Sequence, residues 1–243
     1  MNLTIRSALK RAAIVVASAG GRRSTRWLKE TAEFRSWRRL LSPLVDDPPT
    51  LLRGRAHYEH FFTEFFGLTR EYYEGKAILD VGCGPMGSLE WATHARERVG
   101  LDPLADRYRN LLGHAHAMTY VAARSEAIPY SDGHFDVVAS FNSLDHVEDV
   151  PRTVAEMRRV VSDHGQVLLI VEIGHPPTPT EPHHLDGTLL ELFAPDFRVE
   201  RQRRFGIRDD HDVYASIFEG LPYTDGGAGL LCARLDRVSG AQR

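Results

Sequence analysis

Apolar residues gather in short runs from about residue 77 onward, and amphipathic segments separate these runs. Runs of roughly four to eight apolar residues between turn residues are typical of buried parallel strands, and segments with helical spacing are typical of covering helices. The pattern predicts strands at 77–81, 97–101, 118–122, 135–141 and 165–172, and helices at 88–95, 105–112 and 151–161. This alternation favours a mostly parallel sheet with helices on both faces.

The pattern changes on either side of this core. A proline- and histidine-rich loop at 173–187 leads to a predicted helix at 188–193 and a predicted strand at 197–203, and a last apolar run occupies 229–235. Before the core, aromatic residues at helical spacing predict a helix over 55–73, which would cover the start of the sheet.

A glycine-rich turn follows the first predicted strand. The run AILDVGCGPMG, residues 77–87, brings that strand to Asp80 and then places three glycines at G-x-G-x-x-G spacing. Glycine lets the backbone turn sharply and approach a ligand closely. The second strand ends at Asp102, where a carboxylate can hold the two hydroxyls of a ribose. The pattern therefore predicts a site for an adenosine-containing cofactor.

Asp80 separates the possible cofactors. The glycine spacing alone also marks dinucleotide-binding turns. An acid at the end of the strand would repel a pyrophosphate, but it suits a cofactor that carries an ammonium and a sulfonium group. Pro85 stands where a helix would be starting, a position at which a missing N–H costs little. The alternative is a strand–helix turn that binds no ligand.

The stretch D-V-G-C-G-P, with Asp102 downstream, resembles the class I S-adenosylmethionine (SAM)-dependent methyltransferases. The resemblance is clearest over about residues 75–172. It implies a Rossmann-like α/β fold, doubly wound, with a mostly parallel seven-stranded sheet and an antiparallel last strand, for which 229–235 would serve. It also implies SAM as the cofactor and S-adenosylhomocysteine as the product.

Two further segments carry the resemblance. Residues 126–138 are similar to the family's segment before the fourth strand, where an acid often meets the adenine amino group. Arg124 stands at the commonest position of that acid, so the adenine contact would fall to the backbone, Ser125 or Glu126. The run FNSLDHVEDV, 141–150, resembles the loop beside the transferred methyl. The residues expected to bind the cofactor are Asp80, Gly82, Cys83, Gly84, Asp102, Pro103, Ser125, Glu126 and Asn142.

Candidate bases lie in two loops. Methyl transfer is an in-line displacement from a positively charged sulfur, so the enzyme aligns donor and acceptor and excludes water. An alcohol acceptor must also lose its proton to a histidine or carboxylate within hydrogen-bond reach. The candidates are Asp145 and His146 after the fourth strand, and His183 and His184 after the fifth. For His146 the alternative is a structural role in holding its loop.

The loop after the fifth strand permits three interpretations. It can supply the base for a sugar-like acceptor, it can form a metal site, or its polar residues can simply cap and turn. Histidine with carboxylate can bind a transition metal, and the candidate ligands are Glu172, His175 and His183. Their spacing matches no fixed metal motif, so no metal is predicted. A second polar patch at 208–214 is expected to line the acceptor side or a dimer contact.

Charge divides the chain into two parts. Residues 1–56 hold 12 Lys and Arg against 4 Asp and Glu, a net of +8, whereas the rest holds 18 against 29, a net of −11. We therefore expect a basic helical N-terminal arm over 1–56 and a methyltransferase domain over 57–243. The acidic body argues against a nucleic-acid substrate, because phosphates favour a basic face. The basic arm could contact an anionic membrane.

Targeting signals are weak. No apolar run approaches the roughly 18 residues of a membrane-spanning helix. Cys83 and Cys232 lie far apart and form neither a disulfide framework nor a metal motif, which fits a reducing cytoplasm. The start resembles a signal peptide, but its apolar segment is short and SAM is made in the cytoplasm. A cytoplasmic protein is expected, and a homodimer is possible.

The segments GCGPMGSLEWA, VGLDPLADRY, FNSLDHVEDV and EPHHL together resemble bacterial methyltransferases found with glycan-assembly genes. This resemblance implies O-methylation of a sugar, a glycan or another polar small-molecule hydroxyl. Two alternatives stay open. One is C- or N-methylation of a lipid-like or secondary-metabolite acceptor, with the arm resting on a membrane. The other is a protein that binds SAM without transferring its methyl group.

Overall fold

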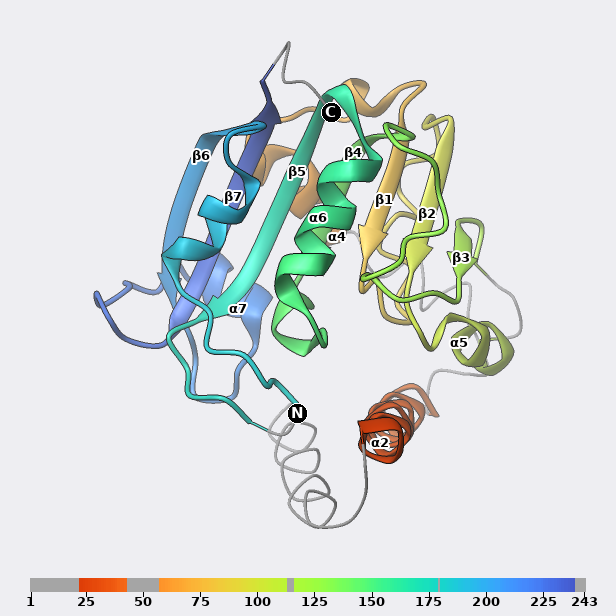
Figure 1. The fold of residues 1–243 in the computed structure, drawn as a ribbon, viewed down its shortest axis with the longest axis vertical. Coiled ribbons are helices and arrows are strands. Elements are labelled where there is room, and N and C mark those ends of the chain that lie inside the picture. Colours follow the sequence, from red (N-terminus) through yellow and green to blue (C-terminus); the bar gives the residue numbers. More distant parts are fainter. Residues whose placement is uncertain (1–21, 43–56, 113–115, 179, 239–243) are drawn as a thin grey trace.

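A single seven-stranded sheet organises the protein. The computed structural model describes residues 22–42, 57–112, 116–178 and 180–238. In this part of the chain the strands follow the order β3-β2-β1-β4-β5-β7-β6 (Figure 1). Their bounds are β1 (Ala77–Val81), β2 (Glu97–Leu101), β3 (Thr119–Val121), β4 (Phe135–Phe141), β5 (Val161–Ile173), β6 (Phe197–Gly206) and β7 (Gly229–Arg237).

The direction of the strands confirms the predicted topology. Strands β1 to β5 pair in parallel, and β7 lies antiparallel between β5 and β6. The sheet is therefore doubly wound, with an antiparallel last strand. The order of connection reverses at β1, which pairs with both β2 and β4. Ligands of such sheets bind beyond the carboxyl ends of the strands at this reversal.

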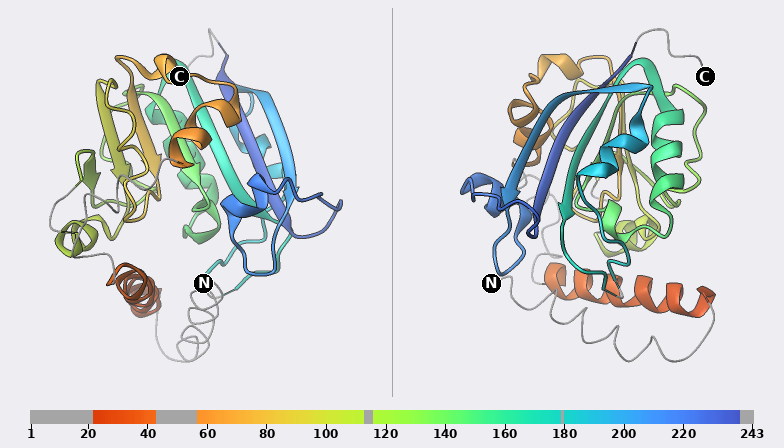
Figure 2. Two further views of the ribbon diagram at one scale, coloured as in Figure 1. Left: turned by 180° about the vertical axis from the view of Figure 1, so that it is seen from behind. Right: turned by 60° about the vertical axis from the view of Figure 1, so that its left-hand side comes forward.

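Helices cover both faces of the sheet (Figures 1 and 2). One face carries α4 (His57–Phe62) and α7 (Val213–Phe218), and the other carries α6 (Val150–Val160) and the 3-10 helix η5 (Gly187–Phe193). Alternate residues of each strand supply the two cores, because successive side chains of a strand point to opposite faces. Ile78 belongs to the core beneath α4, and Leu79 belongs to the core beneath α6.

Helix α6 forms where the sequence predicts it. The Asp149 side chain accepts a hydrogen bond from the Arg152 backbone N–H, and proline follows at the start of the helix. A side-chain acceptor at the N-cap and a proline in the first turn satisfy the free end of a helix with little cost. Buried apolar residues on one stripe then pack α6 onto the sheet.

Two predicted helices differ in the structure. Residues 88–95 form turns in which the Ala92 and Ala95 N–H groups donate to carbonyls three residues earlier. The Arg98 side chain also donates to the carbonyls of Leu89 and Glu90. Pro85 consequently starts no helix. The predicted helix at 55–73 divides into α4, η2 (Glu64–Phe66) and η3 (Glu71–Tyr73), since Gly67 adopts the left-handed conformation with φ 73°.

Part of the basic arm is a helix that packs on the body. Within the predicted arm, 1–56, the structure describes residues 22–42, and α2 spans Arg22–Leu41. Leu41 is fully buried beside Met86, and Phe34 stacks on Tyr108 of α5 (Ala105–Leu111). Helix α2 lies beyond the carboxyl ends of β1 and β2 (Figure 1). Within the described residues, every helix is too short or too polar to cross a membrane.

Candidate cofactor and acceptor site

The glycine-rich turn after β1 is held in a fixed shape. Gly82 has φ 76°, and a Cβ atom there would lie 2.3 Å from the Cβ of Ser143. The Tyr120 hydroxyl donates to the Gly84 carbonyl at 3.0 Å and accepts from the Gly87 N–H at 3.1 Å. Only glycine fits the close approach at Gly82 without strain. The neighbouring strands therefore shape the turn before any ligand arrives.

Asp80 is a buried acid whose carboxylate could bind a positively charged group. Its Oδ2 accepts a hydrogen bond from the Ser88 hydroxyl, and its Oδ1 has no partner among the described residues. Burial raises the pKa of Asp80 to about 7. A buried carboxylate is costly unless a donor or a positive charge reaches it. The ammonium group of SAM would supply that charge, so Asp80 fits the expected cofactor.

Asp102 lies at the end of β2, beside the same turn. Its Oδ1 accepts from the Leu104 N–H at 2.8 Å, and its Oδ2 accepts from the Gly84 N–H at 3.2 Å. Burial, and then the charge of Glu33, raise the pKa of Asp102 to about 7. Each carboxylate oxygen keeps a further lone pair, which can accept a ribose hydroxyl. Two acids on either side of the turn disfavour a pyrophosphate.

Asn142 ends β4 with an unusual backbone. Its φ is 54°, its N–H donates to the Ile170 carbonyl at 2.6 Å, and its buried Oδ1 has no partner among the described residues. A strained residue with a buried, unused amide oxygen is typical of a binding site. Such an oxygen would accept from an N–H or O–H donor, which the methionine part of SAM carries.

Four further residues predicted to bind the cofactor differ in their contacts and burial. The Ser125 and Thr153 hydroxyls lie 3.0 Å apart, and Glu126 accepts from the Glu148 N–H at 2.8 Å. Burial raises the pKa of the Cys83 thiol well above its usual value, which suits a packing role. Pro103 is exposed directly after Asp102. Binding of the cofactor by these four residues stays a prediction.

Helix α2 covers the turn, which the sequence did not reveal. The Trp37 ring lies 3.7 Å from the position of a Cβ at Gly84, and Lys29 donates a hydrogen bond to the His146 carbonyl. Glu30 and Arg124 form an ion pair with an N–O distance of 2.9 Å. Arginine-rich composition gave no sign that this helix carries cofactor-facing residues. Arg124, which replaces the family's usual acid, anchors α2 instead.

The predicted bases lie in the two loops as expected, but most imidazoles there face backbone carbonyls. His183 Nε2 lies 2.9 Å from the Val147 carbonyl, and His184 Nδ1 lies 2.9 Å from the His175 carbonyl. His146 Nε2 lies 3.7 Å from the fully buried Asp145. A nitrogen that donates to a carbonyl cannot accept a proton from a substrate. The catalytic roles of these residues stay predictions.

Glu172 and His211 form a pair that the sequence did not single out. Glu172 Oε2 lies 3.4 Å from His211 Nδ1 at the carboxyl end of β5. Glu172 is 2% exposed, and His211 has a left-handed φ of 57°. By strand alternation Glu172 shares its face with Leu168 and Ile170, and Asp80 shares the same face with Ile78. The pair and the cofactor acid therefore lie on one side of the sheet.

Aromatic side chains line this side. Tyr58 of α4 meets Tyr214 of α7 edge to face, with ring centroids 5.6 Å apart, and Tyr214 also packs on Phe61 at 4.8 Å. Burial, then the neighbouring Tyr58 and the charge of Asp80, raise the pKa of Tyr214 well above its usual value. Tyr214 thus lies within electrostatic reach of Asp80, and we call Tyr58, Phe61 and Tyr214 the aromatic wall.

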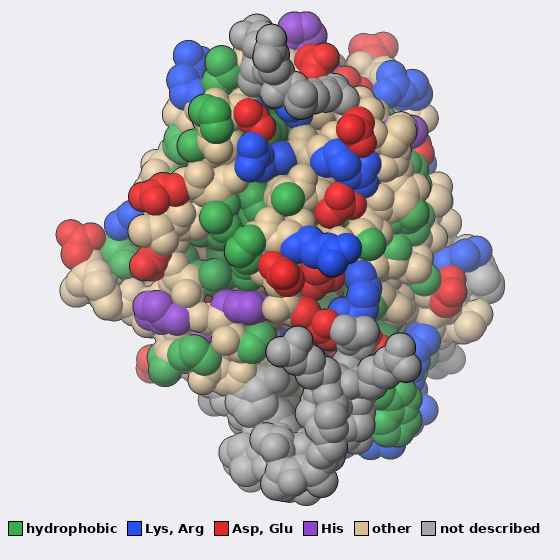
Figure 3. Space-filling view, viewed as in Figure 1, with side chains coloured by type: hydrophobic (Ala, Val, Ile, Leu, Met, Phe, Trp, Pro, Cys, Tyr) green, Lys and Arg blue, Asp and Glu red, His purple; other side chains and the backbone are tan. Residues whose placement is uncertain are grey.

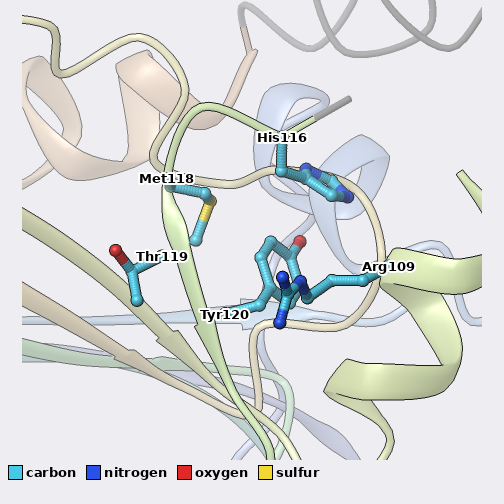
Figure 4. A pocket seen from close by; sticks show the side chains of 5 residues that line it. All are labelled: Arg109, His116, Met118, Thr119 and Tyr120. Atoms are coloured by element: carbon cyan, nitrogen blue, oxygen red, sulfur yellow. The ribbon is translucent and has the colours of Figure 1, made fainter. Parts of the chain in front are cut away.

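Two cavities have linings that include neither Glu172 nor His211. One, of about 260 Å³, opens beside β3 and is lined by Arg109, His116, Met118, Thr119 and Tyr120 (Figure 4). The other, of about 450 Å³, lies beside η5 and includes His184 and Arg204 among its lining residues. On the face toward η5, acidic, basic and histidine side chains intermingle near the end at which the parallel strands finish (Figure 3).

The fold and these acids define a Rossmann-like protein that binds a positively charged nucleoside cofactor. A family model described as a methyltransferase domain matches residues 79–169. An uncharacterized methyltransferase of Mycolicibacterium vanbaalenii is 31% identical over 180 residues, which are 68% of this chain and 67% of that protein. The chain belongs to the class I SAM-dependent methyltransferases.

Two further proteins are similar to parts of the chain. A ubiquinone/menaquinone biosynthesis C-methyltransferase of Shewanella piezotolerans is 30% identical over 51% of this chain, and the match spans 44% of that enzyme. The crystal structure of a SAM-dependent methyltransferase from Mesorhizobium loti has a TM-score of 0.52 and 20% identity. The match covers 70% of this chain and 98% of the Mesorhizobium loti chain. This structural likeness supports the fold alone.

Proposed function

We propose that the protein transfers the methyl group of SAM to a hydroxyl oxygen of a sugar, a glycan or another polar small molecule. The observation that carries this proposal is the Glu172–His211 pair, on the same side of the sheet as Asp80. An oxygen acceptor must lose a proton as it attacks, and an imidazole steadied by a carboxylate can take that proton.

SAM, when bound, supplies a methyl group on a positively charged sulfur. Asp80 binds the cofactor's ammonium group, Asp102 holds the ribose, and α2 excludes water from the turn. His211 directs Nδ1 to Glu172, and Nε2 is the atom that would accept the proton of the hydroxyl. Glu172 then stabilises the imidazolium that forms. These residues bind, orient and deprotonate, and alignment of donor with acceptor supplies much of the rate.

The aromatic wall favours a second candidate, C-methylation of an apolar, ring-containing acceptor. Tyr58 and Tyr214 are partly exposed and pack around the fully buried Phe61, so their rings are the surface on which an aromatic acceptor would stack. The similarity to a quinone-pathway C-methyltransferase supports this candidate. A lipid-like acceptor of this kind would also give the basic arm a membrane role. Flotation with anionic liposomes, for the full chain and for a chain lacking residues 1–50, tests that role.

Identification of the product distinguishes the candidates. Purified protein is given SAM carrying a ¹³C methyl group, with either oligosaccharides or phenolic quinols as acceptors. NMR then separates O–CH3 from C–CH3 products. An O–CH3 product on a sugar supports the first proposal, and a C–CH3 product supports the second. If SAM binds in calorimetry but neither acceptor class is methylated, both proposals fail as stated.

A matched pair of variants tests the base. His211→Gln should lower kcat by about 100-fold or more and leave the dissociation constant of SAM unchanged. His134→Gln is the control, because His134 pairs with Glu97 at 2.7 Å near the amino end of β4, away from the site. It should keep full activity. Full activity in His211→Gln would remove His211 from the mechanism.

A further inference from the structure

Three buried side chains converge at the carboxyl end of the sheet, beside the site described above. Asp145 lies in the 3-10 helix η4 (Leu144–His146), and His175 and Glu181 lie in the loop after β5. Each offers one ligand atom, and these atoms all lie within 4.8 Å of one another. Their exposed fractions are 0%, 8% and 4%. Lys29 lies within electrostatic reach of Asp145, so the group combines two buried acids, one imidazole and a neighbouring ammonium.

His175 supplies the observation that points to a ligand. Its Nδ1 lies 3.1 Å from the Pro176 carbonyl, an acceptor, so Nδ1 carries the hydrogen and Nε2 carries the lone pair. The buried Nε2 has no hydrogen-bond partner in the part of the chain that the structure describes. A metal-binding histidine typically donates its second ring nitrogen to a carbonyl in this way. The geometry leaves Nε2 ready to bind a cation.

Hydrogen bonds fix the loop that carries these ligands. The Thr178 N–H donates to the Glu181 carbonyl at 2.8 Å, and the Thr178 hydroxyl donates to a Glu181 carboxylate oxygen at 3.2 Å. His146 Nδ1 lies 3.1 Å from the Thr180 carbonyl, which joins η4 to the loop. The loop and η4 therefore hold the three ligands in one place without an ion.

We infer that Asp145, His175 and Glu181 form a binding site for a divalent first-row transition metal ion. One imidazole nitrogen and two carboxylate oxygens suit Mn²⁺, Fe²⁺ or Zn²⁺, whereas Mg²⁺ and Ca²⁺ favour oxygen alone. Atoms about 2.1 Å from one ion lie at most about 4.2 Å apart. Small side-chain rotations therefore close the site, and the two carboxylate charges balance the ion.

This ligand set replaces the one suggested by sequence spacing. Of Glu172, His175 and His183, only His175 belongs to it. Glu172 pairs with His211, and His183 faces the Val147 carbonyl. Asp145 could not be found from spacing, because the fold brings it to His175 from a different loop. An ion here would keep open positions beside η4, which follows Asn142, and these could bind an acceptor oxygen. Only this last step rests on the proposed function.

Metal binding is tested on the full-length protein, freed of metal by a chelator and without any acceptor. Calorimetric titration with Mn²⁺ should show one saturable site per chain. Glu181→Gln and His175→Gln should each weaken Mn²⁺ binding by more than about tenfold. His134→Gln is the control and should bind Mn²⁺ as the unaltered protein does. No saturable site, or unchanged affinity in both ligand variants, overturns the inference.

Two further measurements keep the outcome clear. Each variant is first titrated with SAM, since retained SAM binding shows that it folds. Electron spin echo modulation of Mn²⁺ on the unaltered protein should show coupling to a ¹⁴N nucleus. Absence of ¹⁴N coupling overturns the site even if a variant fails to fold. Methyl-transfer assays are separate, so absence of a saturable Mn²⁺ site in a protein that still transfers methyl groups overturns the metal site and leaves the proposed function in place.

Discussion

The Trp37 ring in α2 lies over Gly84 of the glycine-rich turn, 3.7 Å from the position that a Cβ would take there. Trp37 also packs with Leu41 and Met86, so a helix from the basic arm borders the turn at which we expect the cofactor to bind. We therefore predict that loss of these contacts weakens cofactor binding.

We expect Trp37→Ala to weaken S-adenosylhomocysteine binding by about tenfold, because a large ring leaves the cover of the turn. Calorimetric titration measures this change. Trp27→Ala is the control, since Trp27 lies on the same helix and is 62% exposed. It should bind the product normally. Equal affinities for both variants would show that α2 does not support the site.

The affinity for SAM should rise with pH through about 7. The pKa values of Asp80 and Asp102 are both raised to about 7 by burial, and the carboxylate forms are those that hold the ammonium and the ribose. Below pH 7 each acid should increase the dissociation constant by up to about tenfold per pH unit. Calorimetry between pH 6 and 8 measures this slope. Asp80→Asn should bind weakly with a flatter slope, and an unchanged slope would contradict the assignment.

The same two acids should make the unliganded protein less stable as pH rises. Their folded-state pKa values lie above the unfolded value of 3.8, so between about pH 4 and 7 the folded state binds more protons than the unfolded state. The free energy of unfolding then falls across that window. At pH 8, Asp102→Asn should raise the free energy of unfolding by on the order of 1–3 kcal/mol.

Chemical denaturation of the unliganded protein checks this prediction. Asp106→Asn is the matched control, because the Asp106 side chain is 71% exposed and lies on the neighbouring helix α5. Its unfolding curve should follow that of the unaltered protein at both pH 5 and pH 8. If Asp102→Asn is no more stable than this control at pH 8, burial does not penalise the Asp102 charge as described.

Gly82→Ala should destabilise the protein through a steric clash with Ser143. The new Cβ would lie 2.3 Å from the Ser143 Cβ. Gly75→Ala separates this clash from backbone strain, because Gly75 has a similar φ of 68° and open space around it. Thermal unfolding should show a loss about 2 kcal/mol larger for Gly82→Ala. Similar losses of stability in the two variants would mean that the positive φ alone, and not the clash with Ser143, causes the destabilisation.

Lys29→Met should tighten Mn²⁺ binding by about three- to tenfold, because the Lys29 ammonium lies within electrostatic reach of Asp145 and repels a second cation. Lys76→Met is the control, since Lys76 lies over the Tyr72 ring just before β1. Calorimetric titration compares the two variants. Unchanged affinity in Lys29→Met would show that this charge does not reach the ion.

The pattern of apolar and polar residues predicted the strands and the two acids beside the glycine-rich turn. Apolar runs located the seven strands, and Asp80 and Asp102 were found because each ends a strand beside the turn. Residues 88–95 were misassigned: they form turns, and Arg98 donates to two of their carbonyls. His211 was expected only as part of the polar patch at 208–214. Its pairing with Glu172 and the Asp145–His175–Glu181 group were missed, since tertiary folding alone brings such distant residues together.

The position of α2 has a kinetic consequence. The helix lies over the glycine-rich turn through Trp37, near Asp102 through Glu33, and on the loop after β4 through Lys29. We expect a cofactor bound at this turn to pass α2 as it enters or leaves. The lifetime of bound product then depends on how often this helix detaches, and the turnover rate can be set by its packing as much as by the chemical step.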